Sequence, residues 1–200
     1  MRYSTVASIG KGVYKSRGSK FYSFIHPLKS SDDHRHLITI YRNRYPESCH
    51  VCSSYRILLG SRIDEFSGDD GEPKGSAGTP ILNQLRRNNL INVGAYVVRI
   101  FGGSLLGISG LIESYSESSL LAIDSINHLD WRENKEISFS LSYKYEGLLK
   151  AIIKEFNAAI INDKYSDRIE ILVTIDIEYA NVFIEEVKNS SSGKIIISAN

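Results

Sequence analysis

The feature that most constrains this sequence is the segment Gly68 to Gly75, which reads GDDGEPKG. Three of its eight residues are glycine and one is proline. Glycine adopts positive φ angles without steric cost and proline lacks a backbone donor, so helix and strand are both disfavoured here. The segment therefore predicts a tight loop with several positive φ angles.

This loop leads into a predicted helix over residues 76–88, and the junction has two interpretations. In the first, loop amides stay free at the positive end of the helix dipole, where an anion can bind. In the second, Asp69 or Asp70 accepts hydrogen bonds from those amides and the loop is a rigid turn. The Gly-Lys-Ser/Thr ending of a P-loop is missing, and both interpretations stay open.

Three carboxylates, those of Asp69, Asp70 and Glu72, lie in the same loop. They are candidates for a hard-cation site, or for an acid and base pair in which Asp70 or Glu72 is catalytic. The spacing differs from that of an EF-hand loop, and the sequence nominates no nucleophile. Solvated or capping carboxylates are therefore favoured, and we expect no metal and no cofactor.

Both cysteines belong to the sequence Cys49-His50-Val51-Cys52. A redox pair requires a helix N-terminus and a zinc site requires two further ligands, and neither is apparent. The segment instead has the composition of a strand, which places Cys49 and Cys52 on opposite faces. We expect two buried thiols beside a polar His50.

Apolar periodicity predicts alternating strands and helices over residues 1–130. Short strands are expected from Tyr3 to His26, followed by a helix over 32–44 that buries Leu37, Ile40 and Tyr41. Residues 60–67 are assigned to the loop. The other predicted elements are a strand over 49–59, the helix over 76–88, a strand over 93–101, and a helix over 107–127 that buries Leu111, Ile112, Tyr115, Leu120, Leu121 and Ile123.

A polar stretch near residues 130–134 predicts a boundary between a domain of residues 1–130 and a domain of residues 131–200. A chain of 200 residues suits two cores of this kind. The second domain reads as strand, helix, two strands, helix and strand, the βαββαβ order of a ferredoxin-like unit. Its strands are predicted over 136–143, 159–165, 168–177 and 194–198, and its helices over 146–157 and 179–189.

Charge is uneven along the chain, although the formal net charge is only +1. Residues 1–62 carry 11 Lys and Arg against 3 Asp and Glu, residues 63–130 carry 4 against 9, and residues 131–200 carry 9 against 11. The basic first third either attracts a polyanion or is an ordinary solvated surface. Tyr55 and Arg56 are candidates for stacking on a base and pairing with phosphate, or for ordinary sheet packing.

Hydropathy predicts neither a membrane span nor a signal peptide. No apolar run approaches the roughly 20 residues of a spanning helix. Two closely spaced cysteines cannot form the disulfide framework of a secreted protein, which favours a reducing compartment. We therefore expect a cytoplasmic protein.

Two motifs resemble those of the YigZ/IMPACT family, DDGEPSGTAGxPIL and TRYFGGIKLGxGGLxRAY. The first corresponds to residues 69–82 and the second to the segment that includes residues 99–115. A third family segment, H-N-C-x-A-Y-R, resembles the residues around His50, Cys52, Tyr55 and Arg56. The predicted binding surface consists of His50, Tyr55, Arg56, Asp69, Asp70, Gly71, Glu72, Gly75, Ala77, Gly78, Arg99, Phe101, Gly102, Gly103 and Gly110.

The resemblance implies an α+β protein with two domains. The first is expected to fold like domain 2 of the fifth small-subunit ribosomal protein, and the second like ferredoxin. Eukaryotic relatives regulate translation initiation through regions that this chain lacks, so their partner is not carried over. For bacterial members the resemblance implies association with the ribosome or RNA, without an established reaction.

The chain departs from the family pattern where Leu105 replaces a lysine, Glu113 an arginine, and Thr79 an often basic residue. Fewer cations weaken phosphate binding, because each contact adds about one unit of slope in log K against log salt. We expect a non-enzymatic regulatory or binding protein connected with translation, whose glycine-rich loop surface contacts RNA, the ribosome or a protein. The alternative is an enzyme for a phosphorylated or acyl small molecule that uses Asp70 or Glu72. The oligomeric state stays open.

Overall fold

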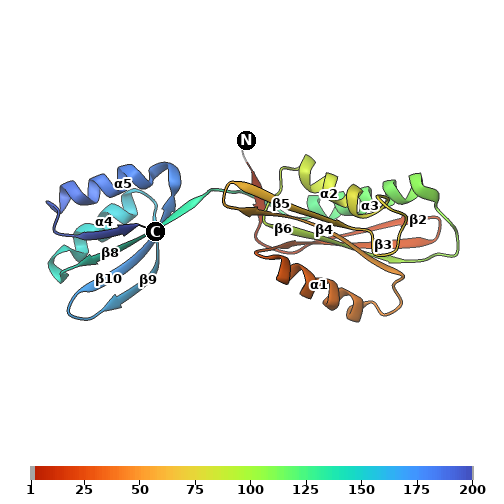
Figure 1. The fold of residues 1–200 in the computed structure, drawn as a ribbon, viewed down its shortest axis with the longest axis horizontal. Helices are drawn as coiled ribbons and strands as arrows, with labels where there is room; N and C mark the ends of the chain where they lie inside the picture. Colours follow the sequence, from red (N-terminus) through yellow and green to blue (C-terminus); the bar gives the residue numbers. More distant parts are fainter. Residues whose placement is uncertain (1–2, 200) are drawn as a thin grey trace. The chain divides into compact units, whose positions relative to one another are not determined.

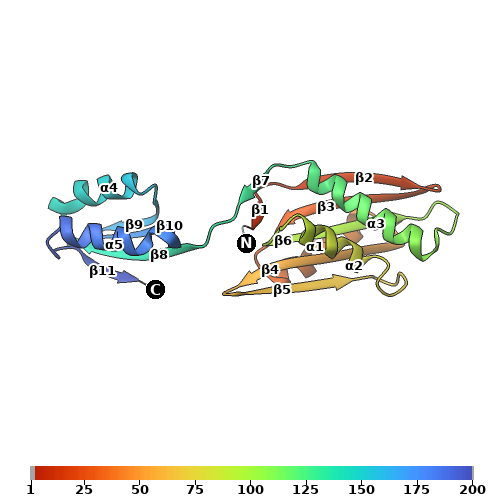
Figure 2. The same ribbon diagram turned by 90° about the horizontal axis from the view of Figure 1, so that it is seen from above.

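A five-stranded antiparallel sheet organises the first of two units in the computed structural model, which describes residues 3–199. The units divide between Trp131 and Arg132, one residue beyond the expected boundary. The strand order of the sheet is β2-β3-β6-β4-β5 (Figures 1 and 2). The elements of this unit are β1 (Ser4–Val6), β2 (Gly10–Ser16), β3 (Ser19–Pro27), α1 (Ser31–Arg44), β4 (His50–Leu59), β5 (Arg62–Gly68), α2 (Gly78–Arg87), β6 (Val93–Ile100), α3 (Gly107–Asp124) and β7 (His128–Asp130).

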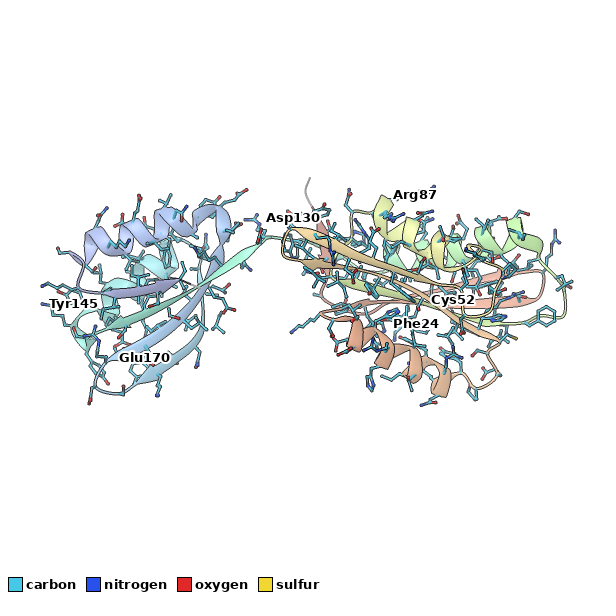
Figure 3. All side chains as sticks on the ribbon, viewed as in Figure 1. Phe24, Cys52, Arg87, Asp130, Tyr145 and Glu170 are labelled. Atoms are coloured by element: carbon cyan, nitrogen blue, oxygen red, sulfur yellow. The ribbon has the colours of Figure 1, made fainter. Side chains whose placement is uncertain are left out.

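Helix α1 covers one face of this sheet, and α2 and α3 cover the other (Figure 1). Because successive strand residues point to opposite faces, each face has its own core. Cys52 and Phe21 belong to the core beneath α2 and α3, whereas Val51 and Phe24 belong to the core beneath α1. Phe24 and Cys52 are labelled in Figure 3.

Helix α1 confirms the predicted helix over 32–44 but not all of its predicted buried face. Ser30 caps the helix by accepting a 3.1 Å hydrogen bond from the Asp33 amide. The buried side chains are His34 and Tyr41, and the prediction that Ile40 is buried is wrong, because Ile40 is 41% exposed. Tyr41 stacks on Phe24 with ring centroids 4.3 Å apart, which holds the helix to the sheet.

Strand β5 was not expected, because residues 60–67 were assigned to the loop. It pairs with β4 in register from Ser53 opposite Gly68 to Leu59 opposite Arg62. Gly60 has a φ of 61°, which lets the chain reverse immediately after β4. β5 is an edge strand with polar residues, so its apolar alternation is weak.

Small residues set the packing of α3, and the predicted burial of Ile112 and Leu121 is wrong. These two side chains are 41% and 44% exposed. The helix instead buries Ser114, Ser118, Ser119 and Ala122, in addition to its large apolar residues. A Cβ added to Gly12 of β2 would lie 2.6 Å from the Ala122 amide nitrogen, so helix and strand approach too closely for larger side chains.

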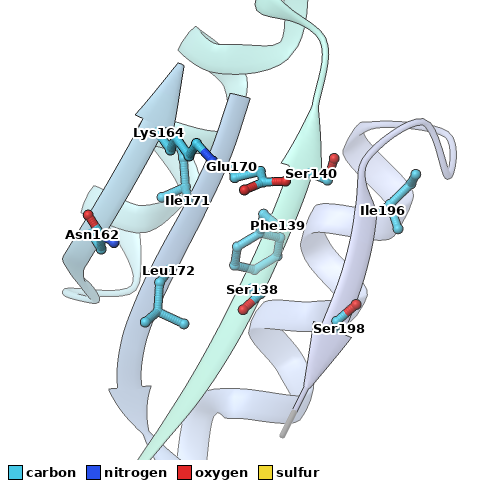
Figure 4. A pocket seen from close by; sticks show the side chains of 10 residues that line it. All are labelled: Ser138, Phe139, Ser140, Asn162, Lys164, Glu170, Ile171, Leu172, Ile196 and Ser198. Atoms are coloured by element: carbon cyan, nitrogen blue, oxygen red, sulfur yellow. The ribbon is translucent and has the colours of Figure 1, made fainter. Parts of the chain in front are cut away.

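The second unit has the predicted βαββαβ order and the strand order β11-β8-β10-β9, which is ferredoxin-like. The α+β fold class is thereby confirmed. Two helices cover one face of its sheet, and Figure 4 shows the other face, which is hollowed by about 320 Å³. The elements are β8 (Asn134–Leu141), η1 (Tyr143–Tyr145), α4 (Glu146–Glu155), β9 (Ala159–Tyr165), β10 (Ile169–Asp176), α5 (Ile177–Ser190) and β11 (Ile196–Ala199).

Among the helices of residues 3–199, none has the length and apolar character needed to cross a membrane.

Candidate functional site: a groove over a buried ion pair

The Asp69 carboxylate accepts hydrogen bonds from backbone amides where the glycine-rich loop leads into α2. Its Oδ2 accepts a 2.8 Å hydrogen bond from the Gly75 amide, and its Oδ1 accepts bonds of 3.0 and 2.8 Å from the amides of Ala77 and Gly78. The prediction of a free anion cradle at this junction is therefore wrong. The alternative, in which an aspartate accepts these amide hydrogens and makes the loop rigid, is confirmed.

The remaining features of the loop support this rigidity. The amides of Glu72 and Ser76 donate to the carbonyls of Asp69 and Pro73, each at 2.9 Å. Burial would raise the pKa of Asp69, but the three amide hydrogen bonds outweigh it and hold this pKa below its ordinary value. Positive φ angles occur as predicted, at Asp70, Gly71 and Gly75.

Asp70 joins the loop to two other elements and does not line a site with Glu72. Its Oδ2 accepts a 2.6 Å hydrogen bond from the Val51 amide of β4, and its Oδ1 is paired with Arg42 of α1. Its backbone carbonyl lies 2.7 Å from His50 Nδ1. These contacts engage both carboxylate oxygens, so they do not support the alternative in which Asp70 is the acid or base of a catalytic pair.

The Glu72 side chain is buried and contacts residues of β4, β6 and α3. Its Oε1 accepts hydrogen bonds from Arg99 Nη1 of β6 at 2.6 Å and from the Tyr115 hydroxyl of α3 at 2.8 Å, and it lies 3.9 Å from His50 Nε2 of β4. Only 8% of the Glu72 surface and 6% of the Arg99 surface is exposed. Ionic groups that are removed from water in this way need good mutual geometry, which the short contacts provide.

Arg99 has a buried donor, Nε, that no described residue satisfies. Its guanidinium carbon lies 5.6 Å from the centre of the Phe21 ring and 5.7 Å from that of Phe101, within the range of cation–π attraction. Arg99 Nε is buried and has no hydrogen-bond partner among the described residues. Buried polar atoms are nearly always satisfied, so this donor requires an explanation.

A groove of about 410 Å³ opens above the ion pair. His50, Glu72 and Arg99 line it, together with the apolar side chains of Phe101, Leu105, Leu106, Ile108 and Leu111. Leu105 is 84% exposed, and Ile108 is 62% exposed. These leucine and isoleucine residues were missing from the predicted surface, because Leu105 was interpreted only as the replacement of a family lysine.

His50, which lines this groove, has an unprotonated Nε2 when its ring is neutral. Because the Asp70 carbonyl can only accept, the 2.7 Å contact assigns the proton to Nδ1. Nε2 then carries the lone pair and lies 3.9 Å from Glu72 Oε1. Within residues 3–199, two residues that line the groove therefore carry unpaired polar groups, a donor on Arg99 and an acceptor on His50.

Tyr55 and Arg56 do not line the groove, which corrects the prediction that they share one binding surface with Arg99. In the register of β4 and β6, His50 is opposite Arg99 but Arg56 is opposite Val93. Arg56 donates to Glu65 at 2.8 Å and to the Leu90 carbonyl at 2.9 Å.

The Tyr55 side chain belongs to the opposite face of the sheet, beneath α1. Its hydroxyl donates to Asp64 at 3.0 Å, and its ring stacks on Phe66. Both Tyr55 and Arg56 are therefore part of the sheet packing rather than of a base or phosphate site.

The two cysteines differ, and the prediction that both thiols are buried is wrong for Cys49. Cys49 is exposed and lines the groove, whereas Cys52 is fully buried. The Cys52 thiol donates to the Asp69 carbonyl at 3.1 Å, and burial raises its pKa far above the ordinary value. Within residues 3–199, no three His, Cys, Asp or Glu side chains gather as a metal site would require.

Glycines place the segment that carries Leu105. A Cβ added to Gly102 would lie 1.8 Å from the carbonyl carbon of Gly18, so only glycine allows the end of β6 to touch the turn between β2 and β3. Gly103 has a φ of 88°, a conformation that other residues rarely adopt. The Gly110 position is less crowded, with Leu106 Cβ at 3.2 Å.

Comparison with known proteins agrees with this architecture. The family model described as the Impact N-terminal domain matches residues 17–123, and a domain of unknown function, DUF1949, matches residues 139–194. A crystal structure of a hypothetical protein superposes with a TM-score of 0.71 at 23% identity, covering 100% of this chain and 97% of the other. That similarity shows the fold.

Curated relatives cover nearly the full length. The IMPACT family member YvyE of Bacillus subtilis is 28% identical over 195 residues, which are 96% of this chain and 88% of YvyE. The IMPACT family member YigZ of Escherichia coli is 26% identical over 193 residues, which are 94% of this chain and 92% of YigZ. The chain therefore belongs to the IMPACT family, as its two motifs predicted.

Proposed function

We propose that this chain is a non-enzymatic regulatory protein connected with translation, and that it binds a protein of the translation apparatus through the groove. The observation that carries the proposal is the group of exposed apolar side chains around the groove, led by Leu105 at 84% and Ile108 at 62% exposure. Apolar surface of this kind marks sites of protein interaction.

Two observations favour a protein over RNA. Three arginines in or near the predicted binding surface are already in ion pairs, Arg99 with Glu72, Arg42 with Asp70 and Arg56 with Glu65. Phosphate contacts would have to compete with those carboxylates.

The open sheet face of the second unit also lacks features of RNA readers. Its central strands present Ser138, Ser140, Glu170 and Leu172 outward, while Phe139 is buried in the core. Sheets that bind RNA place aromatic rings at such positions to stack on bases.

Cosedimentation of the purified chain with bacterial ribosomes over a salt series tests the proposal. Leu105→Asp should weaken retention about tenfold or more, because it places a charge in an apolar interface. Leu59→Asp is the matched control, since Leu59 is also exposed, at 51%, but lies at the far end of β4.

The salt dependence decides between the two kinds of partner. Protein contact through the groove predicts retention that changes little with salt. RNA contact predicts a steep decline, of about 0.7 to 0.9 in log K against log salt for each phosphate contact. A steep decline that Leu105→Asp does not affect would contradict the proposal, and so would absence of retention at every salt concentration.

A further inference from the structure

The groove combines three features that together specify a ligand. Arg99, which lines it, holds a buried guanidinium donor, Nε, that has no hydrogen-bond partner among the described residues. His50, another lining residue, has an acceptor at Nε2 in the neutral ring. Most of the other lining side chains are apolar, among them Leu106, Ile108 and Leu111.

The charge of Arg99 argues against an anionic ligand. Glu72 Oε1 already neutralises the guanidinium at 2.6 Å, and both groups are almost fully buried. A carboxylate or phosphate in the groove would be a second negative charge beside one cation, with little water to solvate it. A neutral carbonyl oxygen satisfies the Nε donor without that cost.

A peptide backbone supplies both complementary groups, since each residue carries one carbonyl acceptor and one N–H donor. A volume of about 410 Å³ accommodates a short extended segment rather than a folded element. The aliphatic walls then suit one apolar side chain of that segment.

We propose that the groove binds an uncharged peptide segment of the protein partner, with one apolar side chain between Ile108 and Leu111 and one backbone carbonyl on Arg99 Nε. This inference rests on the proposed function for the origin of the segment. Because Arg99 Nε is enclosed, this contact requires the Phe101 ring, which is 44% exposed and 5.7 Å from the guanidinium carbon, to turn aside.

The probe is N-acetyl-leucine methylamide, a single leucine with neutral amide groups on both sides. It is titrated into the isotopically labelled full chain while NMR follows the Arg99 Nε–H resonance and the groove amides. We expect a saturable shift of the Arg99 resonance with a dissociation constant on the order of 1 mM. N-acetyl-glycine methylamide should bind about tenfold more weakly or less, because it lacks the apolar side chain.

Two variants locate the binding. Ile108→Asp should abolish the shift, whereas Ile9→Asp, which changes an isoleucine 46% exposed elsewhere in the unit, should leave it intact. The inference is overturned if Arg99 Nε–H does not respond, or if the glycine probe binds equally well. Tighter binding of N-acetyl-leucine, whose carboxylate is charged, would also overturn it and identify an anion site.

A second copy of this chain is the remaining occupant to test. Sedimentation equilibrium that shows a dimer dissociated by Leu105→Asp would overturn the inference in favour of self-association. Failure of the peptide-binding inference can be distinguished from failure of the proposed function. Ribosome retention lost in Leu105→Asp, without a peptide response, would leave the docking surface in place and remove only the mode of recognition.

Discussion

Glu72 Oε1 accepts a 2.6 Å hydrogen bond from Arg99 Nη1, and so joins the glycine-rich loop to the end of β6 across 27 positions of sequence. Tyr115 adds a third element, because its hydroxyl donates to the same oxygen at 2.8 Å. The carboxylate that the sequence offered as a catalytic acid or base is thus the centre of a structural network. This network joins three segments that contribute lining residues to the groove.

Removing one member of this pair should be strongly destabilising. Arg99→Met leaves the Glu72 carboxylate buried without its guanidinium partner, and should lower the free energy of unfolding by about 3 to 5 kcal/mol in urea titration. The double variant Glu72→Leu with Arg99→Met should cost less than the sum of the single variants by about 2 kcal/mol.

The exposed pair of Arg35 and Asp32 is the control for this prediction. Arg35→Met should cost no more than about 1 kcal/mol, because a surface ion pair is well solvated. Additive effects in the Glu72 and Arg99 cycle would contradict the coupling that we infer from the 2.6 Å contact.

Asp69 should be the residue on which the conformation of the loop depends. Asp69→Ala leaves the amides of Gly75, Ala77 and Gly78 without their acceptor, and should lower the free energy of unfolding by about 3 kcal/mol. Glu117→Gln, an exposed position on α3, should be nearly neutral under the same urea titration.

Protonation of Asp69 at low pH should lower the free energy of unfolding of the wild type in the same way. Because the folded-state pKa of Asp69 is depressed, its contribution is complete above the unfolded-state pKa and is lost as pH falls through the folded-state pKa. Wild type and Asp69→Asn should therefore converge in stability at low pH. A constant difference between them down to strongly acidic pH would rule out this linkage.

His34 should make the first unit sensitive to mild acid. Its ring nitrogens lie 2.9 Å from the Tyr96 hydroxyl and 3.3 Å from Ser53 Oγ, and burial, helped by the charge of Arg35, lowers its pKa from 6.5 to about 4. The unfolded chain takes up a proton first, so stability falls as pH decreases from about 6.5 to about 4, by about 3 kcal/mol in total.

Urea titrations at several pH values between neutral and acidic conditions measure this slope. His34→Gln should remove most of the stated change, whereas His36→Gln, an exposed position on the same helix, should keep it. Equal slopes in the wild type and His34→Gln would show that other groups are responsible.

The two cysteines should differ sharply in reactivity. Cys49 is exposed, whereas Cys52 is buried and its thiol bonds to the Asp69 carbonyl. An aromatic disulfide reagent should therefore modify one thiol per folded chain, and the second only after unfolding. Cys49→Ser should remove the rapid reaction, and Cys52→Ala should preserve it. Comparable rates for both thiols in the folded chain would contradict the burial of Cys52.

Local sequence was sufficient for the parts of this protein that depend on neighbouring residues. Glycine and proline between Gly68 and Gly75 predicted the loop and its positive φ angles, because these depend on backbone sterics alone. Apolar periodicity predicted the βαββαβ order of the second unit. The weakly alternating edge strand β5 was missed, because its pairing with β4 rather than its own pattern defines it.

Tertiary structure decided what the loop can do. Whether the loop amides are free depends on the orientation of the Asp69 carboxylate, which accepts their hydrogen bonds in the structure. The same local sequence is compatible with either orientation. The groove depended on contacts between residues far apart in the chain, such as Glu72, Arg99 and Tyr115. Composition and motif therefore determined the family and the location of the loop. Only the packing of three elements around one buried carboxylate turned that region into an apolar groove, because hydrogen-bond partners and exposure are properties of the folded chain.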